Sequence, residues 1–128
     1  MDEFHTSKPI YLQLADRIHR QIVSKELAAG QKLPSVREMA ITFNVNPNTI
    51  QRTYSELERE EIVETRRGQG TFVTENEDLL IELRGKLKEE QISIFVQVMQ
   101  EMGYSASEIT SGLQEYLTKR AKGDEERD

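Results

Sequence analysis

The chain has 128 residues, with 17 Lys+Arg against 23 Asp+Glu, a net charge of −6 and 36% hydrophobic residues. This length suits one domain of ordinary size, or a small domain with a short appendage. Cys is absent, which excludes a disulfide framework, a thiolate metal site and a cysteine nucleophile. The two imidazoles, His5 and His19, are expected to lie at the surface rather than to bind a metal.

No segment of the sequence is typical of targeting or of membrane insertion. A membrane-spanning helix needs about 18 consecutive apolar residues, and no such run is present. Residues 1–5 show neither the basic start nor the apolar stretch of a signal peptide. We therefore expect a cytoplasmic protein without a membrane partner.

The net charge is distributed unevenly along the chain. Residues 1–74 carry ten Lys+Arg and ten Asp+Glu, whereas residues 75–128 carry seven against thirteen. The whole excess of six negative charges therefore lies in the tail, and the two stretches are expected to face different surroundings.

Three helices are predicted in the first 60 residues. Pro9 suits the first turn of a helix over residues 9–24, because a first turn does not use its N–H. The sequence Ser-Val-Arg-Glu at residues 35–38 is a capping box, which opens a helix of about two turns ending near residue 43. Asn-Pro at residues 46–47 predicts a third helix that runs to about residue 60.

A β-hairpin is predicted after the third helix. Its strands are residues 62–66 and 71–73, and Gly68-Gln69-Gly70 forms a tight turn between them. Residues 31–34, between the first two helices, are expected to be short and extended.

The spacing of small and apolar residues in the second and third helices is that of a helix-turn-helix. Ala40 suits a close crossing of two helices, and Asn44 can adopt the positive φ that the turn needs. The apolar residues expected to point inward are Met39, Phe43, Val45 and Ile50. With the preceding helix and the following hairpin, residues 1–75 are predicted to form a winged helix-turn-helix domain.

The tail, residues 76–128, is predicted to form a two-helix arm. Residues 77–102 form one helix of roughly 38 Å at 1.5 Å per residue, and Gly103 ends it. A second capping box at residues 105–108 opens a helix over residues 106–121. The charged end, residues 123–128, is expected to be disordered. The predicted fold is thus mainly α, with a small β-hairpin wing.

The arm is predicted to join two copies of the chain in a homodimer. The long helix is apolar on more than one face, and the single apolar stripe of the last helix can cover one face only. Packing against the winged domain is the alternative shelter. The residues expected at the dimer interface are Leu83, Leu87, Ile94, Phe95, Val98, Met99, Leu113, Tyr116 and Leu117.

Four stretches of the sequence resemble the DNA-binding domain of the GntR family of bacterial transcription regulators: Pro9–Leu14, Leu33–Glu38, Val45–Glu58 and Arg67–Val73. The resemblance covers residues 8–74 almost continuously, and the two-helix tail is similar to that of the YtrA-type subfamily. It implies a homodimer that binds a palindromic operator in double-stranded DNA, commonly as a repressor and often near ABC-transporter genes.

The physical chemistry of the matched residues agrees with DNA binding. The start of the third helix would enter the major groove, where Asn and Gln pair with adenine and Thr reaches a thymine methyl group or a phosphate. Arg37 matches the DNA-contacting Arg of the family's Leu-Pro-Ser-x-Arg-Glu pattern, and the wing glycines allow backbone to approach the minor groove. The predicted DNA-binding residues are Ser35, Arg37, Asn46, Asn48, Thr49, Gln51, Arg52, Arg66, Arg67, Gly68, Gln69 and Gly70.

Several of these residues also have a purely structural interpretation. Asn46 would cap its helix in any case. Arg37 could form a surface ion pair with a nearby Glu, and Gly68 and Gly70 would be needed by any tight hairpin. Arg59 is expected to pair with a neighbouring Glu rather than with DNA.

No motif for nucleotide binding, zinc hydrolysis or a serine nucleophile occurs, so we expect no enzyme and no cofactor. A winged helix that binds protein is the alternative function, supported by the acidic net charge and by Glu56, Glu58, Glu60 and Glu61. An unidentified small-molecule effector is compatible with DNA binding. Because a two-helix tail has little room for a pocket of roughly 300 Å³, an effector site is expected at the dimer interface.

Overall fold

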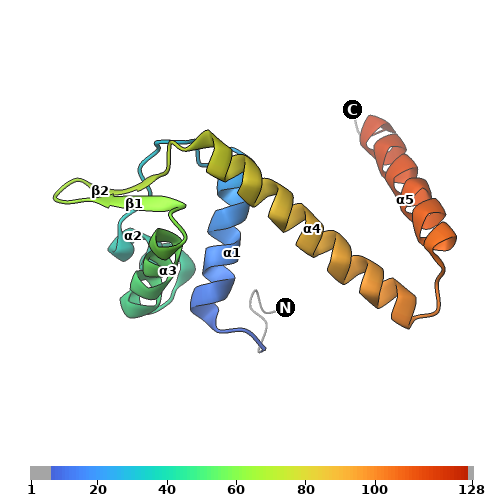
Figure 1. The fold of residues 1–128 in the computed structure, drawn as a ribbon, viewed down its shortest axis with the longest axis horizontal. Coiled ribbons are helices and arrows are strands. Elements are labelled where there is room, and N and C mark those ends of the chain that lie inside the picture. Colours follow the sequence, from blue (N-terminus) through green and yellow to red (C-terminus); the bar gives the residue numbers. More distant parts are fainter. Residues whose placement is uncertain (1–6, 127–128) are drawn as a thin grey trace. The chain divides into compact units, whose positions relative to one another are not determined.

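The computed structural model describes residues 7–126, which form five helices and one two-stranded antiparallel sheet (Figure 1). Residues 1–5, on which the signal-peptide expectation rests and which include His5, lie outside the described residues. The chain divides into two compact units, residues 1–85 and residues 86–128. The division falls after Gly85 rather than after residue 75, because the first turns of the long helix belong to the first unit.

Three helices form most of the first unit: α1 (Ile10–Val23), α2 (Val36–Phe43) and α3 (Pro47–Arg59). The predicted capping box opens α2. The Ser35 hydroxyl oxygen accepts a hydrogen bond from the Glu38 N–H at 3.1 Å, and the Glu38 carboxylate accepts one from the Ser35 N–H at 3.0 Å. The backbone hydrogen bond from Ser35 and its hydroxyl lower the pKa of the Glu38 carboxyl below its ordinary value.

The turn between α2 and α3 confirms the helix-turn-helix. Asn44 has φ 53° and ψ 52°, the left-handed conformation that Asn tolerates better than most residues. The Val45 N–H donates to the Ala40 carbonyl oxygen at 3.0 Å, which closes the end of α2. Ala40 is buried, as expected for a small residue where two helices cross.

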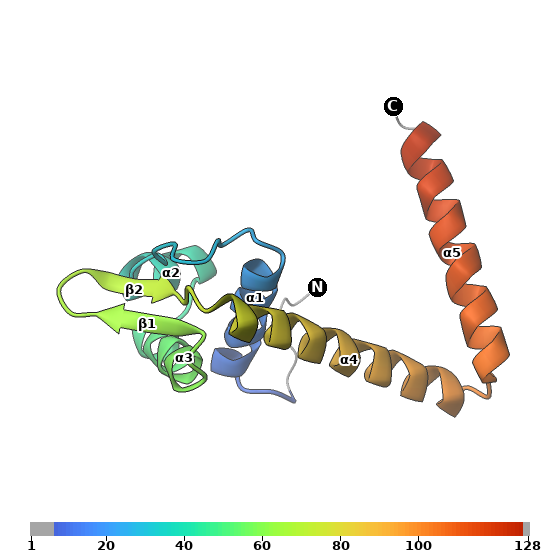
Figure 2. The ribbon, with the colours of Figure 1, turned by 45° about the horizontal axis from the view of Figure 1, so that its top comes forward.

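The wing is an antiparallel hairpin of β1 (Val63–Arg66) and β2 (Gly70–Val73), which extends away from the three helices (Figure 2). Gly68 and Gly70 have φ of 76° and 123°, and a Cβ at Gly70 would lie 2.7 Å from the Lys32 side chain. The predicted extended segment pairs with the other edge of β2, where the Leu33 N–H donates to the Thr71 carbonyl oxygen at 2.8 Å. Conformation thus favours glycine at both positions, whereas the close atom at Gly70 belongs to the flexible end of Lys32, which can move aside.

The core of the first unit lies between α1, α2, α3 and the hairpin. Burial favours polar groups that are hydrogen-bonded within the core, and the buried Nδ1 atom of His19 is an exception, with no partner among the described residues. The Tyr54 hydroxyl donates to the Pro34 carbonyl oxygen at 2.6 Å, and burial raises the pKa of Tyr54. The buried apolar side chains are Leu14, Ala15, Ile18, Ile22, Leu33, Met39, Ala40, Ile50, Leu57, Ile62, Val63, Val73 and Leu83.

Two residues of the first unit differ from the sequence-based expectation. His19 is buried rather than at the surface, because α1 packs against α3; its Nε2 lies 3.2 Å from the Glu60 carboxylate at the end of α3. Leu83 is only 8% exposed, so it belongs to the core of the first unit and is not an open interface residue.

The second unit contains the remainder of α4 (Glu77–Glu101) and α5 (Ala106–Glu126). Gly103, with φ 92°, follows the end of α4, and the Tyr104 N–H donates to the Met99 carbonyl oxygen at 3.1 Å. This 6→1 bond is the Schellman stop expected at a glycine. The second capping box is also present, with Ser105–Glu108 distances of 3.0 and 3.2 Å.

The expected disordered end is wrong for residues 123–126, which continue α5 as far as Glu126. Ala, Lys and Glu favour helix, and a single Gly123 costs only about 1 kcal/mol. Residues 127 and 128 lie outside the described part of the chain.

The two helices of the second unit do not bury each other's apolar stripes. Leu113, Tyr116 and Leu117 on α5 are 44%, 60% and 57% exposed, and Ile109 is buried. Within the described residues, the apolar stripe of α5 is thus covered at Ile109 and open at its other positions. On the long helix, Ile92, Ile94, Phe95 and Val98 are likewise exposed, while Leu87 and Met99 are half-buried.

Candidate nucleic-acid interface

The start of α3 presents polar side chains that are not used inside the protein. Asn48 and Gln51 are exposed, Thr49 is half-buried, and within residues 7–126 the side chains of Asn48 and Gln51 form no hydrogen bond. The Asn46 side-chain oxygen accepts from the Asn48 N–H at 2.8 Å, so its capping role is confirmed. The amide N–H groups of Asn46 are not needed for that cap.

Arg52 lies one residue beyond this group on α3 and stacks over an aromatic ring. Its guanidinium carbon is 4.1 Å from the centroid of Tyr11, which belongs to α1. Arg52 is exposed and forms no ion pair with any residue that the structure describes. The predicted DNA-facing cation is therefore held by a ring and not by a carboxylate.

Arg37 at the start of α2 is also exposed. Across residues 7–126 it forms no ion pair, so the surface ion pair considered as its alternative role is not observed. Ser35, beside it, uses its hydroxyl oxygen as an acceptor in the capping box and keeps its O–H as a donor. The capping box fixes the backbone from which Arg37 projects.

The wing arginines differ from each other. Arg66 donates to the Glu64 carboxylate from Nε at 3.0 Å and from Nη2 at 2.8 Å, and it lies 4.1 Å from the Phe72 ring centroid. Arg67, Gly68 and Gln69 are exposed at the tip, and Gly70 is half-buried.

The partners of these arginines were not identified from the sequence. Glu64 and Arg66 are two apart on β1 and so share a face, and Phe72 lies opposite Glu64 in the hairpin register. The strand register would therefore have revealed the Arg66 cluster. Nothing local in the sequence connects Tyr11 with Arg52, since the two belong to helices that meet only in the folded unit.

The acidic end of α3 is partly neutralised within the domain. Arg59 donates from Nε to the Glu56 carboxylate at 2.9 Å, as predicted, and Glu60 pairs with His19. The hydrogen bond from Arg59 lowers the pKa of Glu56. Two of the four Glu residues that supported a protein-binding function are thus engaged internally.

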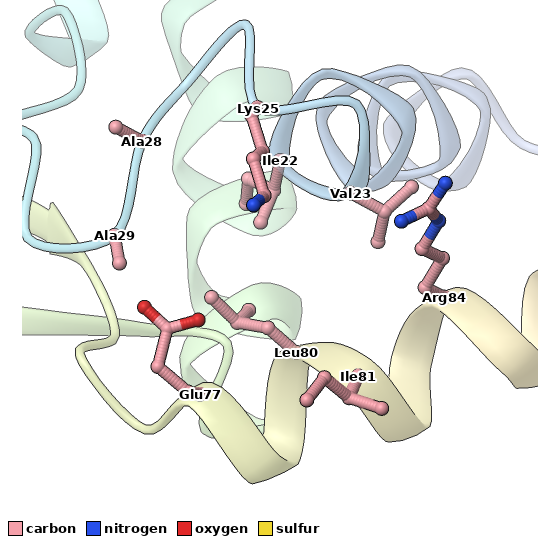
Figure 3. Close-up of a pocket in the computed structure, with 9 residues that line it drawn as sticks. All are labelled: Ile22, Val23, Lys25, Ala28, Ala29, Glu77, Leu80, Ile81 and Arg84. Atoms are coloured by element: carbon pink, nitrogen blue, oxygen red, sulfur yellow. The ribbon is translucent and has the colours of Figure 1, made fainter.

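One hollow of about 430 Å³ lies in the first unit, between the end of α1, the following loop and the first turns of α4 (Figure 3). Ile22, Val23 and Leu80 line its middle, whereas Glu77 and Arg84 lie toward opposite ends. A third charged residue, Lys25, also lines the hollow.

No group of three or more His, Cys, Asp or Glu side chains that could hold a metal ion occurs in the described part of the chain. Among residues 7–126, no helix is both long and apolar enough to cross a membrane.

Comparison with known proteins agrees with this geometry. Residues 10–73 match the family described as bacterial regulatory proteins, gntR family. The chain is 56% identical over 115 residues to the uncharacterized HTH-type transcriptional regulator YhcF of Bacillus subtilis, covering 90% of this chain and 95% of that protein. It is 42% identical over 88 residues to the HTH-type transcriptional repressor YtrA of the same organism, covering 68% of each.

Solved structures show the same similarity. A GntR family transcriptional regulator from Listeria monocytogenes has a TM-score of 0.81 and 39% identity, covering 88% of this chain and 98% of that chain. The DNA-binding domain of AraR, solved in complex with operator ORX1, has a TM-score of 0.52 and 25% identity, covering 58% of this chain and 90% of that one.

The helix-turn-helix, the wing and the exposed polar start of α3 define a winged-helix transcription regulator that binds DNA. The chain belongs to the GntR family of bacterial regulatory proteins, and its relatives are transcription regulators rather than enzymes.

Proposed function

We propose that this protein is a sequence-specific repressor that binds a palindromic operator as a homodimer in the bacterial cytoplasm. The observation that carries the proposal is the set of exposed polar side chains on the helix-turn-helix, Arg37, Asn48 and Gln51, which the described residues leave unpaired. Repression is supported by the relative YtrA, which is named a repressor. Control of ABC-transporter genes is proposed from the family resemblance.

On the operator, α3 enters the major groove as the recognition helix. Asn48 and Gln51 pair with base edges, preferably adenine, and Thr49 contacts a thymine methyl group or a phosphate. Asn46 reaches DNA through the amide N–H groups that its cap leaves unused. Arg37 and the Ser35 O–H contact the DNA backbone, because the N-terminus of α2 favours binding of a phosphate.

The wing contacts the minor groove beside the recognition helix. Arg67, Gly68 and Gln69 form its exposed tip, and glycine lets backbone N–H groups approach the phosphates. Arg66 exchanges its ion pair with Glu64 for a phosphate when DNA binds, and Gly70 sets the conformation of the tip.

The second unit supplies the dimer interface. Ile94, Phe95 and Val98 on α4 are 56%, 39% and 47% exposed. Because about half of each side chain is already covered, its remaining burial stabilises an assembly by roughly 0.5–1.5 kcal/mol. Together with Leu87, Met99 and the α5 stripe, they form the contact with a second copy, and an effector, where one exists, binds at that contact.

Selection of DNA from a random pool tests the proposal. We expect a palindrome whose half-sites lie about one helical turn or a multiple apart. Affinity should fall linearly in log K against log salt, because phosphate contacts release counterions. A failure to select any DNA, together with salt-insensitive binding to a protein, would replace this function by the protein-interaction alternative.

A further inference from the structure

Two arginines on the proposed DNA-binding surface stack on aromatic rings, but only one of them also forms an ion pair. Arg66 stacks on Phe72 and also donates to the Glu64 carboxylate at 2.8 Å. Arg52 stacks on Tyr11 at the same 4.1 Å, and no carboxylate of residues 7–126 pairs with it. Arg52 is therefore the cation whose plane is fixed while its charge remains uncompensated.

Stacking leaves a guanidinium ready to bind. A ring contacts the flat face of the group, so the five N–H donors, which lie in its plane, stay available at the edge. An ion pair has the opposite effect, because it occupies the donors that an anion would use. A guanidinium held in one plane is suited to a bidentate contact with two acceptors.

The backbone that carries the ring makes a second contact between the same two helices, through a hydroxyl that also lies 3.0 Å from the Thr49 carbonyl oxygen. Thr53, the neighbour of Arg52, is fully buried, and its hydroxyl lies 2.9 Å from the backbone carbonyl oxygen of Tyr11. The backbone of Tyr11 is thus tied to the recognition helix beside the residue that its side chain supports. A change in the position of α1 would move the ring, and the Arg52 guanidinium with it.

We propose that Tyr11 is a positioning residue for operator recognition, acting through Arg52. The Tyr11 ring holds the Arg52 guanidinium so that it donates two parallel hydrogen bonds to DNA. The acceptors are a pair of oxygens on one phosphate or the O6 and N7 atoms of a guanine. This inference rests on the proposed DNA-binding function and adds a residue of α1 to it.

A double-mutant cycle on the selected operator tests the inference. We expect Arg52→Ala to weaken binding on the order of tenfold and Tyr11→Leu by about two- to fivefold. Tyr11→Phe, the matched control that keeps the ring, should bind like the wild type. In the Arg52→Ala background, Tyr11→Leu should change nothing further, because a positioning residue has no effect without the group it positions.

The same variants identify the acceptor. With a phosphate, Arg52→Ala lowers the slope of log K against log salt by about one for every operator sequence. With a guanine as the acceptor, Arg52→Ala removes the preference for one base pair of the operator. Tyr11→Leu then weakens the preference at that same base pair.

Three outcomes would overturn the inference: a Tyr11→Leu effect of equal size with and without Arg52, a Tyr11→Phe variant as weak as Tyr11→Leu, or an Arg52→Ala variant as tight as the wild type. The last result, with Arg37→Ala still weakened, removes this inference and keeps the proposed function; selection of no DNA removes both. If Tyr11→Leu does not fold, NMR of the wild type decides, since a stacked Arg52 side chain shows upfield ring-current shifts and an unstacked one does not.

Discussion

The two units of the chain use the same local helix signals but reach different degrees of burial. A Ser-x-x-Glu capping box opens α2 at Ser35 and α5 at Ser105, with hydrogen bonds of nearly equal length. In the first unit, Leu14, Ile50 and Leu57 are at most 1% exposed. In the second unit, the large apolar side chains of both helices are mostly more than one-third exposed.

This difference shows that local signals determine where a helix begins but not what covers it. Most helix stability in proteins comes from packing of an apolar face. The first unit provides that packing from three helices and a hairpin, so its core forms within the unit. The second unit has two helices and an apolar surface that its own described residues leave uncovered, which supports the proposed contact with a second copy.

The largest expected effect follows from disrupting the proposed contact with a second copy. Phe95→Glu should convert the proposed dimer to a monomer, because the new carboxylate would be buried at the interface. The first unit of this monomer should still fold. Operator affinity should fall about 100-fold or more, since a monomer keeps one half-site contact and loses the second one that the dimer links to it. Sedimentation and fluorescence anisotropy measure both effects. Gln91→Glu, which adds the same charge at an exposed polar position, should stay dimeric; a wild-type monomer at micromolar concentration would refute the dimer.

A matched pair of leucines tests the difference in burial directly. In the Phe95→Glu background, Leu57→Ala should lower the free energy of unfolding by about 2–5 kcal/mol, because Leu57 is fully buried. Leu117→Ala, at a position 57% exposed, should change it by less than about 0.5 kcal/mol. Urea unfolding gives both values. Similar losses for the two variants would show that the second unit buries its own stripe.

Arg37→Ala tests whether Arg37, which forms no ion pair within residues 7–126, contacts DNA. We expect a loss of roughly 1–3 kcal/mol in operator binding, from one charged contact. Arg59→Ala is the matched control, since Arg59 is exposed but already paired with Glu56. Anisotropy at moderate salt is the measurement, with circular dichroism to confirm folding. Equal affinity for Arg37→Ala and wild type would remove this residue from the interface.

The wing should contribute affinity without base preference. Arg67→Ala with Gly68→Val is expected to weaken all operators alike and to lower the salt slope by about one. Valine is strained at the φ of 76° that Gly68 adopts, whereas Gly68→Asn tolerates it and serves as the control. Footprinting of flanking A·T positions together with a salt titration measures the effect. Unchanged protection and affinity would show that the wing does not touch DNA.

The smallest expected effect concerns the capping box of α2. The pKa of Glu38 is lowered in the folded protein, so its contribution to stability is present above its ordinary value of 4.5 and is lost as pH falls through the folded value. Glu38→Gln keeps an acceptor for the Ser35 N–H and cannot titrate. The stability difference between wild type and Glu38→Gln should therefore shrink or reverse between pH 7 and pH 3 in thermal melts. A difference independent of pH would contradict this role of the carboxylate.

The sequence by itself determined the elements and the family. Ser35, Asn46, Gly103 and Ser105 predicted helix boundaries to within a residue or two, because caps and left-handed stops act through neighbouring backbone groups. Asn44 marked the turn for the same reason. The predicted DNA-binding residues lie on α2, α3 and the wing, where those local signals placed them.

Only the tertiary structure decided which side chains meet across elements. Tyr11 supports Arg52, His19 is buried beside Glu60, and Leu83 joins the first unit. The same holds for the arm, where caps predicted the start of α5 and the end of α4 but not the exposure of their apolar side chains. Burial and stacking depend on how elements separated by tens of residues pack together. The periodicity of a single helix shows which of its sides is apolar, but not which other element packs against that side.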